Sequence, residues 1–497
     1  MSALRGRKLR PLPVLLALLW LAHAHLAHAA GGYYSGNQGA RAAGRGGAFT
    51  AKADDLSAVI YNPAGIAHLD DTLIQIGNRF SYNASEFTRR PTLDWGDLDN
   101  GVPPYVEFST VRNQEPWQAL DPLLGVASSL GQKDWMFALV AYAPAGTSRA
   151  AFPIDGGQRY LMVRREAIIL DYSANVAWKY REKVGVGLSL QWIHVPLLEY
   201  SLVIDANQFP AHANPVSSEL DMLARTKGSD PFTFNAVIGA WYRPAPYLEL
   251  GISGQVIPSQ IETDSTLSID PIRPEIVDQV ELLRDGDPAN DVHVTLPLPL
   301  TVRAGVRYRE LRGERELFDV ELDVTYESWS RVKRFSLDSN GIRASLLAQT
   351  LDVGRIEVDK QWRDTVSLNL GGDYALLPDL FTLRGGLFYE SAVASSAYAN
   401  VDFVGGTQLG GAVGASMAVR AGLEVALAYE YRVQPTLNVS EADARVYQEV
   451  PGSQCQAPYT DPNNCHARYL GLPAPAVNAG RYAAYSHAAS LDVLYRF

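Results

Sequence analysis

The sequence predicts an all-β protein: a transmembrane antiparallel β-barrel of about 14 strands with a small N-terminal hatch, or plug, inside its lumen. Three observations predict it. The chain opens with a secretory leader, long segments alternate strictly between apolar and polar residues, and short turns alternate with long polar connections between those segments. An outer-membrane barrel combines these features, because it is exported and each strand faces lipid on one side and the lumen on the other.

Residues 1–29 are predicted to be a signal peptide. Basic residues between Arg5 and Arg10 precede the apolar stretch from Val14 to Leu21, and the small residues around Ala29 suit cleavage there. The apolar stretch is too short for a spanning helix, which needs roughly 20 apolar residues. The whole chain has a net charge of -11, and loss of the basic leader makes it more acidic. Nucleic acid is therefore not expected as a partner.

The segment 318–327, FDVELDVTYE, shows the alternation clearly. Every even residue is large and apolar, whereas every odd residue is acidic or threonine. A helix would scatter the polar positions around its circumference, but a strand places them on one face. The same pattern recurs at 300–309, 366–374 and 423–432. A soluble sandwich also alternates, but the length of these segments and their aromatic ends favour tilted transmembrane strands.

The connections between these segments set the strand count. Short turns are expected near 131–134, 181–183, 244–246, 311–314, 377–379 and 420–422. Long polar connections are expected near 85–103, 149–163, 205–230, 270–292, 339–363, 395–406 and 439–480. Strands are then expected to begin near Thr72, Asp121, Trp135, Arg165, Val184, Pro231, Tyr247, Asp291, Glu316, Asp364, Leu380, Thr407, Gly422 and Arg481. An even number of strands closes an antiparallel barrel with both termini on the periplasmic side.

Residues 30–69 do not alternate and are predicted to form the hatch, which leaves 70–497 for the barrel. The stretch is rich in glycine and alanine, and it contains short apolar runs that favour helical turns. Asp54 or Asp55 is expected to N-cap one such turn. Pro63 is expected to end it, because the residue before a proline avoids the helical conformation.

An ordered set of motifs extends from the hatch to the C-terminus. It comprises Gly39-Ala40-Arg41, Gly44-Arg45-Gly46-Gly47-Ala48, Ala53-Asp54-Asp55, Ser57, Tyr61-Asn62-Pro63-Ala64-Gly65, Tyr142, Pro144, Gly146, Asp323-Val324-Thr325-Tyr326, Trp329-Ser330, Leu383-Arg384, Gly386 and Phe497. An isolated Asn-Pro-Ala is unspecific, but the ordered set spans nearly all of the mature chain. It resembles the FadL/TodX family of outer-membrane transporters for long-chain fatty acids and aromatic hydrocarbons.

The resemblance implies a barrel plugged by an N-terminal hatch, and it implies passive uptake of hydrophobic compounds. A ligand would be caught at extracellular loops, pass to a pocket above the hatch and leave sideways through a defect in the wall. Long-chain fatty acids are the expected ligand, and aromatic hydrocarbons are the alternative. The protein would be a monomer in the outer membrane of a Gram-negative bacterium, surrounded by outer-membrane lipid and lipopolysaccharide.

The hatch residues have two interpretations. The stretch Asn62-Pro63-Ala64-Gly65 is either a turn needed for folding or part of a gated constriction. Gly44 and Gly46 are assigned to the same hatch, where glycine permits tight backbone packing inside a barrel.

A lateral exit is predicted at Ala143, Pro144 and Gly146, by analogy with the kinked third strand of the family. Proline cannot donate a ladder hydrogen bond and glycine weakens strand pairing. In lipid, a broken ladder is tolerated only where it lines a cavity. The alternative is a proline at the point where the strand leaves the membrane, as prolines elsewhere in the barrel could also be.

Charged residues of neighbouring strands are expected to share the lumen. They are Arg303, Arg307 and Arg309 with Asp319, Glu321 and Asp323, to which Arg384 and Glu390 are added. Cross-strand pairs of this kind contribute roughly 0.2–1 kcal/mol each, so a structural role is favoured over a ligand-carboxylate site.

Two further predictions concern the C-terminal part. Cys455 and Cys465 lie in one long connection of an exported chain and are expected to form a disulfide, worth on the order of 3 kcal/mol. The last strand ends in Phe497, which is typical of the signal recognised by the outer-membrane assembly machinery. An ordinary edge strand is the alternative.

An enzyme is not expected. No histidine after the leader falls in a metalloprotease, nucleophile-elbow or Cys/His metal spacing, so neither a metal nor another cofactor is predicted. Two other functions fit the same barrel, a structural or adhesive protein and a water-filled porin. A plug of roughly 39 residues argues against the open pore of a porin.

Overall fold

The computed structural model describes residues 37–93, 105–144, 149–205, 218–313, 315–346, 349–353, 355–403, 405–447 and 476–497. The predicted signal peptide, Gly146, Cys455 and Cys465 lie outside these described residues. Within them, no helix is both long and apolar enough to cross a membrane.

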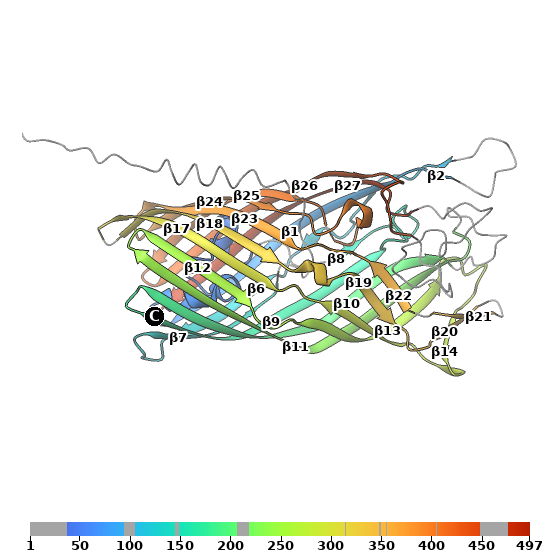
Figure 1. Cartoon of the computed structure of the whole chain (residues 1–497), viewed down its shortest axis with the longest axis horizontal. Helices are drawn as coiled ribbons and strands as arrows, with labels where there is room; N and C mark the ends of the chain where they lie inside the picture. Colours follow the sequence, from blue (N-terminus) through green and yellow to red (C-terminus); the bar gives the residue numbers. More distant parts are fainter. Residues whose placement is uncertain are drawn as a thin grey trace, which may run out of the picture.

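The described strands form a closed barrel of 14 antiparallel strands (Figure 1). The first strand, β1 (Leu73–Arg89), pairs with the last, β27 (Gly480–Arg496), along its whole length. Closure removes the exposed sheet edges that would leave backbone groups unpaired in lipid. The predicted fold class and strand number are confirmed.

Some wall strands are continuous and others are interrupted. Besides β1 and β27, the continuous strands are β9 (Arg164–Tyr180), β10 (Val184–Asp205), β11 (Asp221–Ala245), β24 (Phe381–Glu390), β25 (Gln408–Arg420) and β26 (Leu423–Val439). The interrupted strands are β4 (Val111–Arg112) with β5 (Trp117–Gln118) and β6 (Pro122–Ser128); β7 (Trp135–Tyr142) with β8 (Arg149–Ala151); β12 (Leu248–Gln255) with β13 (Gln260–Pro271); β16 (Asp291–Pro297) with β17 (Thr301–Arg312); β18 (Arg315–Glu327) with β19 (Arg334–Asp338); and β22 (Arg355–Asp359) with β23 (Thr365–Leu377).

The two faces of the wall follow the predicted alternation. On β18, Val320 and Val324 are 45% and 41% exposed, whereas Asp319, Glu321 and Asp323 are at most 2% exposed. Apolar side chains therefore point away from the barrel and carboxylates point into it. Such an outer surface suits hydrocarbon and not water.

Aromatic rings occupy two bands on the outer face. One band lies near the short turns and includes Trp135, Trp178, Tyr180, Tyr247, Tyr308, Phe318, Tyr495 and Phe497. The other lies further along the strands and includes Tyr82, Trp117, Tyr172, Trp192, Phe232, Tyr431 and Tyr485. Such girdles mark the two membrane interfaces of a barrel.

The short turns lie where they were predicted. The N–H of Lys183 donates to the carbonyl oxygen of Tyr180 at 3.0 Å, and the two residues between them, Arg181 and Glu182, both adopt positive φ, 50° and 51°, as a type I′ turn requires. Gly422 has φ 77°, and a Cβ there would lie 2.3 Å from the carbonyl oxygen of Arg496. Glycine is thus needed at position 422, because a side chain there would overlap the backbone of the last strand, β27.

The long connections are more ordered than their polarity suggested. The strand expected from Pro231 already begins at Asp221. The connections also contain β2 (Thr92–Leu93), β3 (Tyr105–Val106), β14 (Glu281–Arg284), β15 (Asp287–Pro288), β20 (Arg343–Leu346), β21 (Gln349–Asp352), η3 (Trp329–Arg331) and η4 (Ser396–Tyr398). Ala344 of β20 belongs to a separate apolar core, which also includes Leu220, Met222, Val277 and Ile342, and Leu282 of β14 packs against it.

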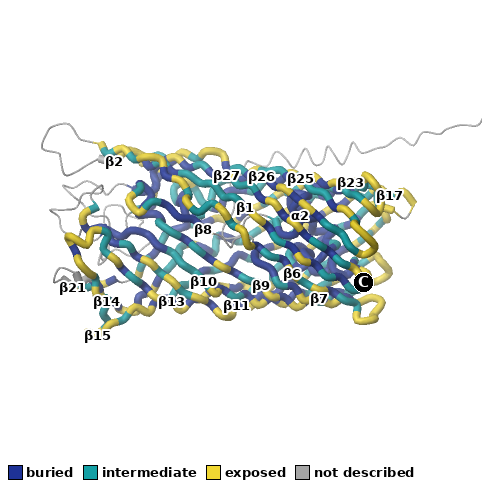
Figure 2. The backbone as a smooth tube through the Cα atoms, turned by 180° about the vertical axis from the view of Figure 1, so that it is seen from behind, coloured by how far each residue is buried: buried dark blue, intermediate teal, exposed yellow. Residues whose placement is uncertain are grey.

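Residues 37–69, here called the N-terminal segment, lie inside the half of the barrel near the short turns (Figure 1). The segment contains α2 (Ala40–Gly44), α3 (Ala58–Tyr61) and η1 (Pro63–His68). It is almost entirely buried, as the dark tube around α2 in Figure 2 indicates. The expected aspartate cap is absent from α3: its N-cap is Ser57, and Asp55 instead accepts the backbone N–H of Ser57 at 2.8 Å.

Candidate functional site

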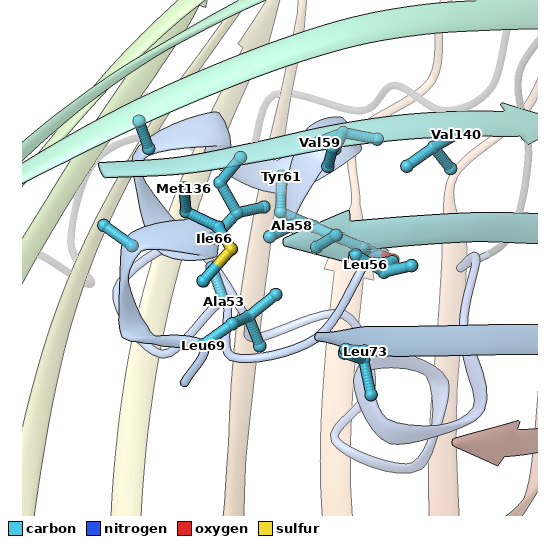
Figure 3. Close-up of a cluster of buried hydrophobic side chains, with 14 of the residues drawn as sticks. Ala53, Leu56, Ala58, Val59, Tyr61, Ile66, Leu69, Leu73, Met136 and Val140 are labelled. Carbon is cyan, nitrogen blue, oxygen red and sulfur yellow. The ribbon is translucent and has the colours of Figure 1, made fainter. Parts of the chain in front are cut away.

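An apolar cluster holds one side of the N-terminal segment against the wall. Leu56, Val59 and Ile66 pack in one buried cluster with Met136 and Val140 of β7 (Figure 3). Fully burying side chains of this size contributes roughly 1.5–3 kcal/mol each. This side of the segment thus faces the strand that carries the predicted lateral exit.

A charged cluster holds the opposite side, and Arg45 is its centre. The Arg45 guanidinium donates from Nη1 to Asp319 and to Asp373, both at 2.6 Å, and from Nη2 to Glu321 at 3.0 Å. Its Nε donates to the carbonyl oxygen of Ala48 at 2.8 Å. Arg45 is completely buried, so its charge depends on these carboxylates.

The lumen carboxylates also bind backbone of the N-terminal segment. Asp323 accepts the N–H groups of Phe49 and Thr50, both at 2.8 Å, and Glu321 accepts that of Ala51 at 2.6 Å. The sequence correctly placed these acids in the lumen. Their main partners, however, belong to the N-terminal segment and not to the neighbouring strand.

The expected cross-strand pairing exists beside this cluster. Arg307 of β17 donates to Asp319 at 2.8 Å and to Glu249 of β12 at 2.7 Å. Arg384 approaches Asp373 at 3.3 Å, and Glu390 pairs with Arg432. The charged residues therefore connect several wall strands as well as the segment between them.

Glycines of the wall let the N-terminal segment approach closely. A Cβ at Gly371 or Gly386 would lie 2.0 or 2.1 Å from the carbonyl oxygen of Arg45. A Cβ at Gly251 would lie 2.4 Å from the carbonyl oxygen of Thr50. Any larger residue would overlap the backbone at these positions, so the wall and the segment are in direct contact.

The predicted hatch glycines take part in the same contacts. A Cβ on Gly44 would lie 3.0 Å from the Cα of Gly414 in β25. Gly46 has φ 63°, and its Cβ would lie 3.1 Å from the carbonyl carbon of Gly386. Gly65 faces its own segment, because a Cβ there would lie 2.2 Å from the carbonyl oxygen of Ala53.

Asn62 joins the N-terminal segment to β11. Its Nδ2 donates to the carbonyl oxygens of Thr50 at 2.9 Å and Ala240 at 3.0 Å, and its Oδ1 accepts the N–H of Ala64 at 3.1 Å. Asn62 is thus the N-cap of η1, and Pro63 occupies its first position, which proline favours. Trp241 of β11 donates from Nε1 to the carbonyl oxygen of Ala64 at 3.0 Å.

Among the described residues, the pairing of this wall strand has a gap at the predicted lateral exit. β7 pairs with β9 as far as Tyr142 opposite Asp171, and the next pair is Arg149 of β8 opposite Glu166; residues 145–148 lie outside the described part of the chain. Ala143 follows directly after the last paired residue of β7. Its N–H donates to the carbonyl oxygen of Pro122 at 3.0 Å.

The N-terminal segment reaches this interruption through Gln38. Gln38 Nε2 donates to the carbonyl oxygen of Ala143 at 2.7 Å and to Asp121 at 2.8 Å. Tyr61 in turn exchanges hydrogen bonds with the backbone of Gln38. Sequence reasoning missed Gln38, since nothing in its neighbourhood marks it as different from the other polar residues of the segment.

A polar cavity of about 160 Å³ connects the two features. Tyr61 of the segment and Pro144 of the interrupted wall both line it, with Asp171 and Arg303. The structure therefore brings Pro144 close to Tyr61, the residue before Asn62, whereas Gly44 and Gly46 lie against β25 and β24.

A second cavity, of about 100 Å³, lies nearer the long connections and is almost wholly apolar. We call it the lumen pocket. Its lining includes Ile169, Val195, Leu267, Leu296, Phe335 and Phe403. One cation, Arg165 of β9, also lines it.

Arg165 is 8% exposed and its guanidinium lies over the ring of Phe403, 4.3 Å from the centroid. Within the described part of the chain, its Nε has no hydrogen-bond partner. Lys360 and Asp402 form a buried ion pair beside it, and Tyr200 donates to Asp402 at 3.1 Å. The lumen pocket is therefore apolar except for a few polar groups and one cation, Arg165, in its lining.

The sequence did not identify this pocket. The resemblance placed ligand capture at the extracellular loops, but the long connections 205–230 and 270–292 can equally form an ordinary loop core. Leu220 and Met222 belong to such a core. A weak signal was available in Arg165, a cation at an inward position of an alternating strand.

The comparisons with known proteins agree with this architecture. A family model described as "Outer membrane protein transport protein (OMPP1/FadL/TodX)" matches residues 21–468. None of the curated proteins matches the chain. No group of three or more His, Cys, Asp or Glu residues suited to a metal ion occurs in the described ranges.

Solved structures share the fold at low sequence identity. A Pseudomonas aeruginosa FadL homologue matches with a TM-score of 0.70 and 15% identity, covering 94% of this chain and 100% of its own. The P. putida toluene transporter TodX matches with 0.59 and 14%, covering 93% and 99%. The Ralstonia pickettii toluene transporter TbuX matches with 0.56 and 15%, covering 93% and 98%. Because the family model covers most of its length, the chain belongs to the OMPP1/FadL/TodX family of outer-membrane transport proteins.

Proposed function

We propose that this protein admits long-chain fatty acids across the outer membrane without energy coupling. The observation that carries the proposal is the lumen pocket, an apolar cavity whose lining includes one cation, the buried Arg165. An acyl chain gains roughly 0.8 kcal/mol for each methylene group it buries. The carboxylate at the end of the chain supplies a charged acceptor for the Arg165 guanidinium, whose Nε has no hydrogen-bond partner in the described part of the chain.

The N-terminal segment acts as the hatch in this proposal, within the predicted unit 30–69. Asn62-Pro63-Ala64-Gly65, Gly44 and Gly46 hold it in the lumen. The close contacts of Gly371 and Gly386 with Arg45 support the role, since they leave no room for a ligand between hatch and wall at that side. A straight route to the periplasm is therefore disfavoured there.

The exit lies in the wall at Ala143, Pro144 and Gly146. The interruption of β7 after Tyr142 supports it, as does the polar cavity that Pro144 shares with the hatch. An amphipathic acid that leaves at this level enters the membrane directly. We propose that the protein is surrounded by outer-membrane lipid and lipopolysaccharide and that it acts as a monomer. We also propose that the assembly machinery recognises the strand ending in Phe497. Cys455 and Cys465 form a disulfide in this proposal.

Aromatic hydrocarbons are the second candidate. TodX and TbuX are described as toluene transporters. In this chain, Phe335 and Phe403 line the lumen pocket and make edge-to-face contacts with each other, 6.0 Å between centroids, and with Trp362. A ring could join such a cluster. A neutral hydrocarbon, however, would leave the charge of Arg165 unpaired.

Uptake measurements separate these candidates. Cells with and without the protein are supplied with oleate or with toluene, and Arg165→Gln is compared with the wild type. We expect oleate uptake to depend on the protein and to fall at least about tenfold in Arg165→Gln, because a hydrogen bond to a charged group contributes about 1.5–3 kcal/mol. Equal oleate uptake with and without the protein would reject the proposal. Protein-dependent toluene uptake that Arg165→Gln leaves unchanged would favour the second candidate.

A further inference from the structure

Two cations and one carboxylate lie close together at the lumen pocket, and of these Arg165 lines it. Arg165, Lys360 and Asp402 are 8%, 0% and 2% exposed. Lys360 and Asp402 form an ion pair one layer behind the pocket lining, and Lys360 Nζ lies 4.7 Å from the ring centroid of Phe335. Charges that are buried this deeply are weakly screened. A cation that already has a carboxylate partner is therefore not available to a ligand, whereas a cation without such a partner is available.

Asp402 is also a neighbour of Arg165. Tyr200 stands directly opposite Arg165 in the β9–β10 register, and its hydroxyl donates to Asp402 Oδ2 at 3.1 Å. The next residue in the chain, Phe403, carries the Arg165 guanidinium on its ring. The charge of Asp402 acts on Arg165 as well as on Lys360.

The acidic residues of β22 do not take the place of Asp402 beside Lys360 and Arg165. Glu357 and Asp359 alternate along the strand with Ile356 and Val358, which line the lumen pocket, so they project from the opposite face. Glu357 is ion-paired there with Arg334. Asp402 is therefore the carboxylate that Lys360 and Arg165 could share.

We propose that Lys360 is a positioning residue that holds Asp402 away from Arg165 and so keeps the Arg165 guanidinium free for the carboxylate of a fatty acid. The inference rests on the proposed function and adds the requirement for an ionised acid as ligand. Without Lys360, the buried Asp402 needs another cation, and Arg165 is the neighbouring one. The Arg165 side chain would then be unchanged, but its guanidinium would be paired with Asp402 and no longer free for a ligand.

The test uses the full-length protein in lipid nanodiscs, with oleate and oleyl alcohol as matched probes. Lys360→Met should weaken oleate binding roughly ten- to hundredfold, which corresponds to the free energy of one hydrogen bond to a charged group. It should leave the affinity for oleyl alcohol nearly unchanged, since the alcohol has no anion for Arg165. The double variant Lys360→Met/Asp402→Asn should regain oleate binding, because the competing carboxylate is gone.

Each result has one meaning. Rescue in the double variant, with oleyl alcohol binding constant throughout, supports the inference. Wild-type oleate affinity in Lys360→Met overturns it, and so does a double variant that fails to bind oleate, whether or not oleyl alcohol still binds. If the wild type binds oleyl alcohol but not oleate, the proposed function itself fails.

Discussion

Arg45 donates to Asp319 across 2.6 Å, and neither side chain is exposed to solvent. The contact joins the N-terminal segment to a wall strand 274 residues further along the chain. Asp373 and Glu321 accept from the same guanidinium, so Arg45 joins three buried carboxylates, and Lys52 of the same segment adds ion pairs to Asp319 at 2.6 Å and Asp373 at 3.1 Å. The segment is held in the lumen by charge on this side and by apolar packing on the side of β7.

Replacement of Arg45 should therefore loosen the segment. Arg45→Met leaves Asp319 and its neighbours buried without their central cation, and breaking a buried pair costs about 3–5 kcal/mol. We expect a lower urea midpoint, and we expect liposomes that contain the variant to swell in small sugars. The control is Arg315→Met, which removes an exposed pair with Asp379 at 2.9 Å and should cost at most about 1 kcal/mol. If liposomes that contain either variant fail to swell in small sugars, Arg45 does not anchor the segment.

Adjacent glycines of β24 offer a second test of the same contact. A Cβ at Gly386 would lie 2.1 Å from the carbonyl oxygen of Arg45, whereas a Cβ at Gly385 has no heavy atom within 4 Å. Gly386→Val should therefore displace the segment or prevent folding, while Gly385→Val should be tolerated. Heat-modifiable mobility on gels reports folding, and sugar permeation reports the seal. Equal behaviour of the two variants would mean that the segment does not rest on β24.

The alternation of the sequence was sufficient to predict the wall. It assigned Asp319, Glu321 and Asp323 to the lumen, because strand geometry alone decides the face of a residue. It could not give Arg45 as their partner, since the position of an irregular segment inside a barrel leaves no periodic signal. Gly371 was visible only as a small residue on a polar face, and Gly386 was part of the motif set, but neither could be assigned a contact with Arg45.

The lumen pocket escaped prediction for a different reason. Arg165, Lys360 and Asp402 come from β9 and from two connections that were expected to be polar loops. Long-range contacts among such connections depend on their own apolar core, here the cluster around Leu202 and Ile342. Local pattern does not encode which of these connections meet.

Loss of the Asn62 amide should weaken the attachment to β11. Asn62→Ala removes the hydrogen bonds to Thr50 and Ala240 and the N-cap of η1. A lost cap costs about 0.5–2 kcal/mol, and each buried carbonyl left unpaired adds to the effect. We expect a lower urea midpoint for Asn62→Ala than for Asn78→Ala, which loses an exposed bond to Ala119 and a half-buried one from the N–H of Asp121. Equal midpoints would make the Asn62 contacts dispensable for stability.

Gln38 provides the last prediction, because it connects the N-terminal segment to the interrupted wall. Its amide satisfies the carbonyl oxygen of Ala143, which has left the β7 ladder, and a buried carbonyl without a partner costs about 1–3 kcal/mol. Gln38→Ala should therefore loosen the wall at this point. The control is Gln75→Ala, which loses bonds to Leu56 and Asp492 on the segment's β1 side.

Hydrogen exchange measures the local effect directly. The Ala143 amide, bonded to the carbonyl oxygen of Pro122 at 3.0 Å, should exchange roughly tenfold faster in Gln38→Ala, since about 1.4 kcal/mol of local stability corresponds to that factor. It should keep its wild-type rate in Gln75→Ala. The same acceleration in both variants would indicate general loosening of the segment, and unchanged exchange in Gln38→Ala would show that the wall edge is held without it. A specific effect would make the N-terminal segment part of what keeps the wall closed at Ala143.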